Sequence, residues 1–459
     1  MASKKELLEA QSFARRRLLT AFTSGAPGGR ELEPTTPVRG LVTGVVLAAL
    51  VVGGSFVAGL FDQGLESGWE NGKIILVRDN AARYVSADGE LVPVPNMASA
   101  RLLAPAGAEI LTVPADDVAD VHRRPVVGIA GAPDSLPEVA DLVTGGWLAC
   151  VAQDGTTATS VVDSPAPEQG GPNSPSALVA VVAGEERSLF LVQDGRRYAV
   201  PGTATTDGVL RALGYTPQDA VTVDARWLEL FPEGGAATPF TVADAGTTPP
   251  GDLADVPGVV VGSVIEVSGQ AFVVLPDGAL ARLDPFADAL YSAGPGGLLS
   301  RESVEPARVA GVQEVAVADG PVDATWPVVI ADPLESGAAP CARLDTETFG
   351  SDLVAGEPVA TGGIAVAPAR GALALFVATA DSASGPVRFI DENGISFPVV
   401  ASSVDLTDTL ERLLGEGADP VRVPYAWGDL FPTGPTLSVD AAGTPLAAGG
   451  AAATPTEQP

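Results

Sequence analysis

The hydrophobic pattern of the chain is dominated by one continuous apolar segment near the N-terminus. Residues 41–61 (LVTGVVLAALVVGGSFVAGLF) carry no charged side chain, and Arg39 and Asp62 flank the segment. A helix rises about 1.5 Å per residue, so this segment spans about 31 Å and matches the ~30 Å hydrocarbon core of a bilayer. The apolar region of a cleavable signal peptide is shorter, about 7–15 residues, and ends at a small-residue cleavage site. We therefore predict an uncleaved transmembrane helix at residues 40–62.

The segment before this span combines an apolar stripe with basic residues. Apolar side chains recur there at helical spacing, at Leu7, Leu8, Ala14, Leu18, Leu19 and Phe22. This pattern predicts a basic amphipathic helix, followed by a linker, within residues 1–39. We expect it to contact a cytosolic partner or anionic lipid through Arg15, Arg16, Arg17, Leu18 and Phe22. The simpler alternative is that these charges only set the orientation of the span.

Charge differs sharply between the two sides of the span. The first 40 residues hold seven basic and four acidic side chains, whereas the rest of the chain holds 19 basic and 53 acidic ones. Basic flanks stay in the cytoplasm, so we place the N-terminus inside and the large C-terminal body outside the inner membrane, as a single-pass protein. A body this acidic is a poor ligand for the phosphate backbone, which argues against nucleic-acid binding.

The exported body repeats one pattern of apolar and polar positions. In residues 188–201 and 386–400, an apolar run leads into Asp194-Gly195 or Asn393-Gly394 and then into an alternating run. Such dipeptides supply the positive φ values of tight hairpin turns, so each block predicts two antiparallel strands. Each block is followed by a Leu-rich helical stretch and then by a near copy of one motif, WLELFPEG (227–234) or WGDLFPTG (427–434).

Two weaker relatives of this block occupy residues 83–103 and 271–293, with turns at Asp88-Gly89 and Asp277-Gly278. Together the four blocks predict four hairpin-plus-helix modules that gain stability by stacking on one another. The repeated positions of Trp227 and Trp427 favour a place in a core over a sugar-stacking surface.

Catalytic chemistry finds little support in the sequence. The nearest string to a phosphate-binding loop runs from Gly68 to Ile74, is one residue too short, and lacks the Ser or Thr that should follow Lys73. His122 is the only histidine, and we expect it to lie exposed in a loop. We expect Asp116, Asp117 and Asp120 to form a solvated surface and not a calcium loop. We therefore expect no catalytic, cofactor or metal site, and no enzyme.

The two cysteines, Cys150 and Cys341, both lie in the exported body. An oxidising compartment allows them to pair, and their spacing is not that of a metal site. We expect a disulfide bond, with two separate buried thiols as the alternative.

A set of residues along almost the whole chain matches one known family. They are Gln11, Arg16, Arg17, Leu18, Ala21, Trp69, Arg83-Tyr84-Val85, Asp88-Gly89, Leu91, Pro93-Val94, Asn96, Ala98-Ser99-Ala100-Arg101-Leu102, Gly128-Ile129, Ala132-Pro133, Leu136-Pro137, Trp147, Cys150 and the two Leu-Phe-Pro-x-Gly copies. With them the sequence resembles EccB, the single-pass membrane component of the actinobacterial type VII (ESX) secretion machinery. The Ala-rich, Lys-poor body and its linkers match only in outline.

The resemblance implies a fold and a set of partners. The fold would be α+β and β-rich, with one N-terminal transmembrane helix followed by an elongated extracytoplasmic body of repeated hairpin-plus-helix modules around a central β-rich domain. The family's paired cysteines map onto Cys150 and Cys341. The partners would be the EccC, EccD and EccE components, with the mycosin protease as a further candidate, together with a second copy of the chain.

These expectations divide the chain into segments. Modules 1 to 4 would occupy 63–110, 176–240, 241–300 and 361–440, the two parts of the central domain 111–175 and 301–360, and a disordered tail 441–459. The expected function is that of a structural subunit of the secretion complex, which scaffolds the pore and its periplasmic assembly. The alternative is a membrane-anchored cell-wall-binding protein or nucleotide hydrolase, since some relatives carry an ATPase label.

Overall fold

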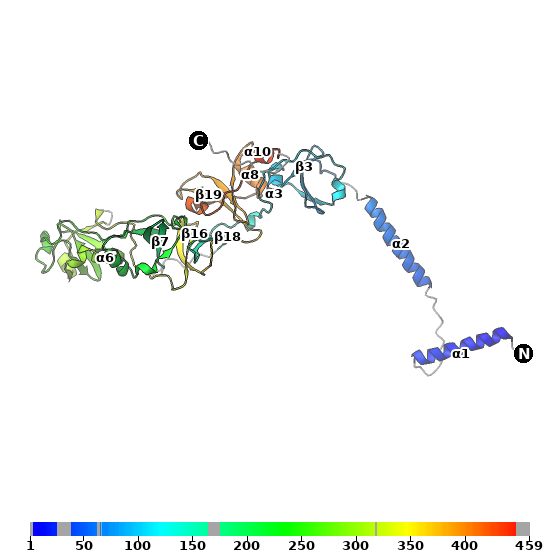
Figure 1. Ribbon diagram of the computed structural model, residues 1–459, viewed down its shortest axis with the longest axis horizontal. Coiled ribbons are helices and arrows are strands. Elements are labelled where there is room, and N and C mark those ends of the chain that lie inside the picture. The colour runs from blue at the N-terminus through cyan, green and yellow to red at the C-terminus, as the bar shows by residue number, and fades with distance from the viewer. Residues whose placement is uncertain are drawn as a thin grey trace. The chain divides into compact units, whose positions relative to one another are not determined.

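The computed structural model describes residues 3–24, 38–61, 65, 67–163, 175–316 and 319–446. It divides into two compact units, Met1–Leu65 and Glu66–Pro459. Figure 1 labels some of the elements of each unit along the chain.

The first unit contains two helices. α1 (Lys4–Ser24) confirms the helix predicted before the span, and the side chains of Leu7, Leu18 and Phe22 on it are exposed. α2 (Val38–Phe61) covers the predicted span, but the side chains of residues 53–61 lie outside the described residues. Within the part of the chain that is described, no helix combines the length and the apolar character needed to cross a membrane.

The second unit contains four modules with the same order of elements. Module 1 consists of β1 (Ile74–Val77), β2 (Arg83–Ala87), β3 (Glu90–Val94), α3 (Met97–Leu103) and β4 (Ile110–Val113). Module 2 consists of β7 (Ala177–Ala183), β8 (Glu186–Gln193), β9 (Arg196–Val200), α4 (Thr206–Ala212) and β10 (Val221–Thr222). Module 3 consists of β11 (Val264–Val267), β12 (Gln270–Val274), β13 (Leu280–Leu283), α6 (Pro285–Ala293) and β14 (Arg301–Ser303). Module 4 consists of β19 (Ala372–Val377), β20 (Val387–Ile390), β21 (Ser396–Val399), α8 (Leu406–Leu413) and β22 (Val421–Pro424).

Each module follows one path. The first three strands form an antiparallel meander, the helix crosses back, and the fourth strand pairs parallel with the first. A short helical turn follows the fourth strand, namely the 3-10 turn Ala115–Val118, α5 (Ala225–Leu228), α7 (Pro306–Val309) or α9 (Tyr425–Gly428). The chain then returns to bridge, in parallel, the third strand of its own module at Arg123, Glu233, β15 (Glu314–Val315) or Thr433.

The hairpins lie at the predicted turns, with a difference in turn type. Asp88-Gly89 and Asp194-Gly195 have positive φ at both positions, as a two-residue turn requires. Among the described residues of the other two turns, only Gly278 and Gly394 take positive φ, because the loops are longer there. In module 4 the Asp391 carboxylate accepts backbone hydrogen bonds across that loop from Asn393 and Ile395.

A fifth sheet is built from two distant parts of the chain. Its order is β17 (Gly350–Gly356), β16 (Ala339–Asp345), β5 (Leu148–Val151), β6 (Thr157–Val161) and β18 (Gly363–Val366). Modules 2 and 3 are therefore inserted between the two halves of this central sheet. We call it the central sheet below.

The sheets place some residues on the other side of the predicted segment boundaries. β4 extends module 1 to residue 113, β14 and β15 extend module 3 to residue 315, and β18 belongs to the central sheet although it lies beyond residue 360. These strands are short and pair in parallel with distant segments, so no local signal marks them.

The start of the predicted disordered tail is ordered. α10 (Val439–Ala442) is capped by Ser438, and the Thr444 carbonyl and the Leu446 amide hydrogen-bond to Gly128 and Val126 of the first part of the chain. These bonds fix residues 441–446, whereas residues 447–459 lie outside the described residues.

The modules pack in two pairs. α3 of module 1 contacts α8 and α10 of the C-terminal end (Figure 1). α4 of module 2 contacts α6 of module 3. One hydrophobic core joins modules 1 and 4, with Leu102, Phe389 and Leu413 among its members, and another joins modules 2 and 3 through Tyr198 and Phe286. A third core joins modules 2 and 4 to the central sheet.

Candidate functional site

The disulfide closes the central sheet where its two halves meet. Cys150 on β5 lies directly opposite Cys341 on β16 in antiparallel register, and the two are bonded. Gly356 on β17 packs against the bridge so closely that a Cβ at this position would overlap the Cys341 sulfur. The predicted pairing is thus present, between one strand from each half of the sheet.

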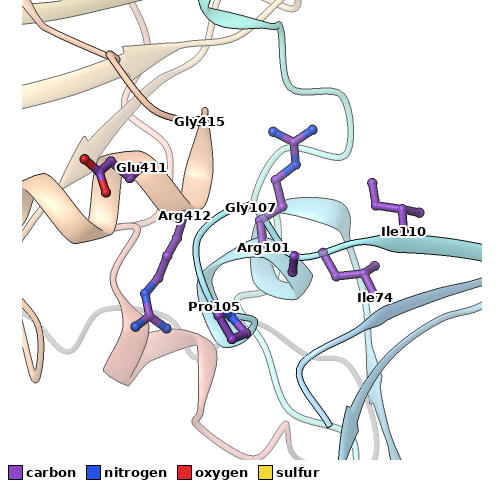
Figure 2. Close-up of a pocket in the computed structure, with 9 residues that line it drawn as sticks. Ile74, Arg101, Pro105, Gly107, Ile110, Glu411, Arg412 and Gly415 are labelled. Carbon is purple, nitrogen blue, oxygen red and sulfur yellow. The ribbon is translucent and has the colours of Figure 1, made fainter. Parts of the chain in front are cut away.

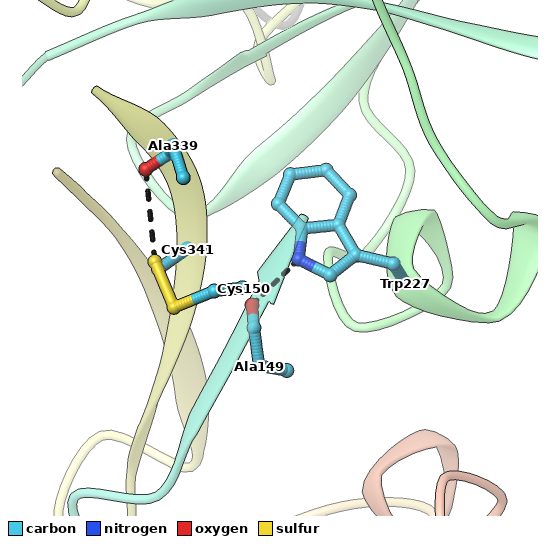
Figure 3. The surroundings of a disulfide bond; sticks show 5 residues. All are labelled: Ala149, Cys150, Trp227, Ala339 and Cys341. Atoms are coloured by element: carbon cyan, nitrogen blue, oxygen red, sulfur yellow. Dashed lines mark hydrogen bonds between the residues drawn. A yellow bond between two sulfur atoms is a disulfide. The ribbon is translucent and has the colours of Figure 1, made fainter. Parts of the chain in front are cut away.

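Two tryptophans dock the neighbouring modules on this sheet. Trp227 of module 2 donates its Nε1 hydrogen to the Ala149 carbonyl of β5 at 2.7 Å, next to the disulfide (Figure 3). Trp427 of module 4 donates to the Ser351 hydroxyl of β17 at 3.0 Å. Both side chains are fully buried, which confirms their predicted place in a core. That core is shared between module and central sheet, and does not belong to the module alone.

Aromatic contacts extend each of these two docking points. Trp427 meets the edge of Trp147 at a centroid distance of 6.3 Å, and Trp147 meets Phe431 at 5.7 Å. At the docking point of module 2, Trp227 packs on Phe231 at a centroid distance of 5.2 Å. The repeated Trp and Phe of the two near-copy motifs therefore form two equivalent anchors on one sheet.

Modules 1 and 3 have no such anchor. When the four modules are aligned on the residue that bridges the third strand, Asp117 and Arg308 occupy the tryptophan position. Arg308 is exposed and Asp117 is half-buried. These two modules do not belong to the core that includes the central sheet, and their residues at this position are polar.

A second junction joins modules 1 and 4 through two arginines. Arg101 of α3 donates to the Leu413 carbonyl at the end of α8 at 3.0 Å. Arg412 of α8 donates to the Ala104 carbonyl at the end of α3 at 3.3 Å, and its Nε pairs with Asp408 at 2.8 Å. Each arginine thus satisfies free carbonyls at the C-terminus of the other helix, where a positive charge is favourable.

These arginines border a cavity of about 200 Å³ between the two modules. Its wall also includes Ile74, Pro105, Gly107, Ala108, Ile110, Glu411 and Gly415, and Figure 2 shows the two guanidinium groups on opposite sides. Burial lowers the pKa of Arg101, and the negative charge of Glu138 partly offsets this. Arg101 forms no ion pair with any carboxylate among the described residues.

The glycine-rich string at 68–74 has a structural role. Its Lys73 forms an ion pair with Glu109 at 2.7 Å, and the backbone amides of Gly72 and Lys73 bond to Ser86 of the adjacent strand. A strand, β1, follows the string, whereas a phosphate-binding loop leads into a helix. The amides of Gly72 and Lys73 are therefore already hydrogen-bonded within the sheet.

The remaining candidate residues of the sequence are surface groups. The His122 side chain is 75% exposed, as predicted, and lies 3.8 Å from Glu90. No group of three His, Cys, Asp or Glu side chains within the described residues could hold a metal ion. Arg15, Arg16, Arg17, Leu18 and Phe22 are exposed on α1, and their predicted contact with lipid or a cytosolic partner stays a prediction.

The sequence did not predict the reciprocal hydrogen bonds that Arg101 and Arg412 donate to each other's helices. Arg101 lies in the block that carries the most specific family resemblance, and this was the only available signal.

A family model described as "Type VII secretion system ESX-1, transport TM domain B" matches residues 1–447. The chain is 26% identical over 440 residues to the ESX-3 secretion system ATPase EccB3 of Mycolicibacterium smegmatis, covering 88% of this chain and 83% of that protein. It is 31% identical over 295 residues to the ESX-5 secretion system ATPase EccB5 of Mycobacterium tuberculosis, covering 61% and 57% of the two chains.

Two solved structures share the fold. The EccB3 dimer from the ESX-3 core complex matches with a TM-score of 0.62 at 22% identity, covering 81% of this chain and all of that chain. The intact ESX-5 inner membrane complex matches with a TM-score of 0.61 at 24% identity, covering 100% and 98%.

Proposed function

Since the chain belongs to the EccB family and is therefore a component of the type VII (ESX) secretion inner membrane complex, we propose that it acts there as a structural scaffold. The observation that carries this proposal is the pair of equivalent anchors, Trp227 and Trp427, on one disulfide-closed sheet. Such a frame holds two module pairs at a fixed junction and offers several surfaces for assembly.

We propose that residues 41–61 span the inner membrane once, with the N-terminus in the cytoplasm and the modules in the periplasm. The support is the uncharged 21-residue segment and the change from a basic flank to an acidic body. The basic helix α1 would then bind a cytosolic partner or anionic lipid through Arg15, Arg16, Arg17, Leu18 and Phe22. The four modules and the central sheet would together form the periplasmic body.

Co-purification tests the scaffold. Tagged chain extracted from membranes should carry the EccC, EccD and EccE components, and the mycosin protease is a further expected partner. A variant with Arg15, Arg16 and Arg17 changed to Glu should lose partners bound on the cytosolic side and keep an unchanged periplasmic fold. If the unaltered chain purifies alone from cells that contain the complete secretion system, the scaffold proposal is wrong.

Nucleotide hydrolysis is the second candidate, because the relatives' names include the word ATPase. The residues that most resemble a phosphate-binding loop are engaged in strand pairing and in the Lys73–Glu109 ion pair. A Lys73→Ala variant distinguishes the two functions. Loss of ATP turnover by the purified chain would support hydrolysis, whereas unchanged assembly and no measurable turnover before or after the substitution would support the scaffold.

A further inference from the structure

The fourth strand lies at one edge of the sheet in all four modules. An edge strand presents unpaired backbone groups, and proteins protect such edges with charge, proline or short length. β14 carries Arg301 and Glu302, β22 carries Arg422 and Pro424, and β10 has only two residues. Three of the four equivalent edges are therefore protected against pairing with another strand.

β4 of module 1 has no such protection. Its sequence, Ile110-Leu111-Thr112-Val113, is uncharged and without proline, and no residue in it is fully buried. The Ile110 side chain is 43% exposed. The carbonyls of Glu109 and Val113 accept hydrogen bonds from the amides of Ile74 in β1 and of Arg78 just after it. The alternate residues Ile110 and Thr112 therefore direct their backbone groups to the open side.

The surroundings of β4 carry opposite charges at its two ends. At its start lies the cavity that Ile110 lines together with Arg101, the half-buried guanidinium that has no ion-pair partner among the described residues. Beyond its end lie Asp116, which is exposed, and Asp117, which is half-buried. In an antiparallel pair, the end of one strand lies beside the start of the other.

We propose that β4 is a self-association surface, on which a second copy of this chain pairs antiparallel across a two-fold axis. The two module 1 sheets then form one continuous sheet. The Asp116–Asp117 turn of each copy lies beside the Arg101 cavity of the other, and the contact is the same in both directions, as in an isologous dimer. The uncharged strand also lets two chains of net charge −31 approach without facing like charges.

This assignment rests on the proposed scaffold function and on the self-association that the family resemblance implies, and it names the surface. The test uses cysteine cross-linking, because both native cysteines are bonded and no free thiol is present among the described residues. Thr112→Cys is compared with Ser303→Cys in the full chain in its membrane. Both residues are exposed and occupy the third position of the fourth strand, but Ser303 lies on the protected edge of β14.

Thr112→Cys should give at least about tenfold more cross-linked dimer than Ser303→Cys on mild oxidation. Thr112→Lys places a charge on the edge, and it should weaken dimerisation in the otherwise native chain by about tenfold or more, whereas Ser303→Lys should leave it unchanged. Both lysines are exposed substitutions, so melting curves like that of the native chain should show that the fold is kept.

Three outcomes overturn the assignment. If the chain dimerises and Thr112→Cys cross-links no better than Ser303→Cys, the surface is wrong although the self-association stands. If Thr112→Cys cross-links only to a different protein, β4 is an assembly edge for another partner and not for a second copy. A chain that stays monomeric in every variant removes both the surface and the self-association.

Discussion

Modules 2 and 4 differ from modules 1 and 3 in their contact with the central sheet, although all four share the order of their elements. All four have the meander, the helix and the parallel fourth strand in the same order. The two modules that touch the central sheet carry Trp227 and Trp427, and the other two carry Asp117 and Arg308 at the same position. The shared pattern thus specifies the module. The residue at the tryptophan position differs according to whether the module packs on the central sheet.

Removing an anchor tryptophan should lower the free energy of unfolding more than any other change to the modules. Trp427→Ala removes a fully buried indole and its bond to Ser351, so we expect the free energy of unfolding to fall by about 3–5 kcal/mol. Arg308→Ala, at the same position of module 3, should change it by less than about 0.5 kcal/mol. Denaturant unfolding of the full chain measures both, and equal losses would contradict the assignment of anchors.

Opening the sheet on which both anchors rest should cost somewhat less. Removing a native disulfide typically costs about 2–5 kcal/mol, and this bond joins residues 191 positions apart. The double variant Cys150→Ser, Cys341→Ser should therefore melt below the native chain without reductant. With reductant the two should melt together, and identical curves without it would exclude a stabilising bridge.

Among the described residues, the reciprocal arginine hydrogen bonds between two module helices occur only in the pair of modules 1 and 4. Arg412→Ala removes charged hydrogen bonds to the α3 terminus, which should cost about 1–3 kcal/mol and speed amide exchange in α3. Arg211→Ala on α4 of the other pair should change stability by less than about 0.5 kcal/mol, since Arg211 is exposed. If the amides of α3 exchange no faster in Arg412→Ala than in the native chain, these arginine hydrogen bonds do not stabilise α3.

The smallest loss of stability is expected from the N-terminal caps of the module helices. Asp405 caps α8 by accepting a hydrogen bond from the Asp408 amide, so Asp405→Ala should cost about 1 kcal/mol. The cap residue of α4, Thr205, makes no such side-chain bond, and Thr205→Ala should cost a few tenths of a kcal/mol. Thermal melting of both variants measures the two losses of stability. Equal losses would show that the loss does not depend on the cap hydrogen bond.

Local sequence predicted the parts of the fold that local physics determines. The turns at Asp88-Gly89 and Asp194-Gly195, the helices after them, the burial of the repeated tryptophans and the Cys150–Cys341 bond are all present. Each depends on residues near one another or on a choice between few partners, as with two cysteines.

The contacts between modules could not be predicted in the same way. The fourth strands have two to four residues and pair in parallel with segments beyond the helix, so their own pattern is too short to mark them. Arg101 and Arg412 each donate to carbonyls of the other's helix although 311 positions separate the two residues, and spacing carries no signal over that distance. The same holds for the cavity that they border.

The nested path of the chain has a consequence for the order of events during synthesis and export. Cys150 emerges 191 residues before its partner, a delay of about 10–40 s at about 5–20 residues per second. Modules 2 and 3 can pack against each other during that interval, while β5 and β6 still lack the strands that complete their sheet. The first thiol must therefore stay unreacted until the second arrives, so a thiol-exchanging catalyst in the exporting compartment should speed maturation of this chain.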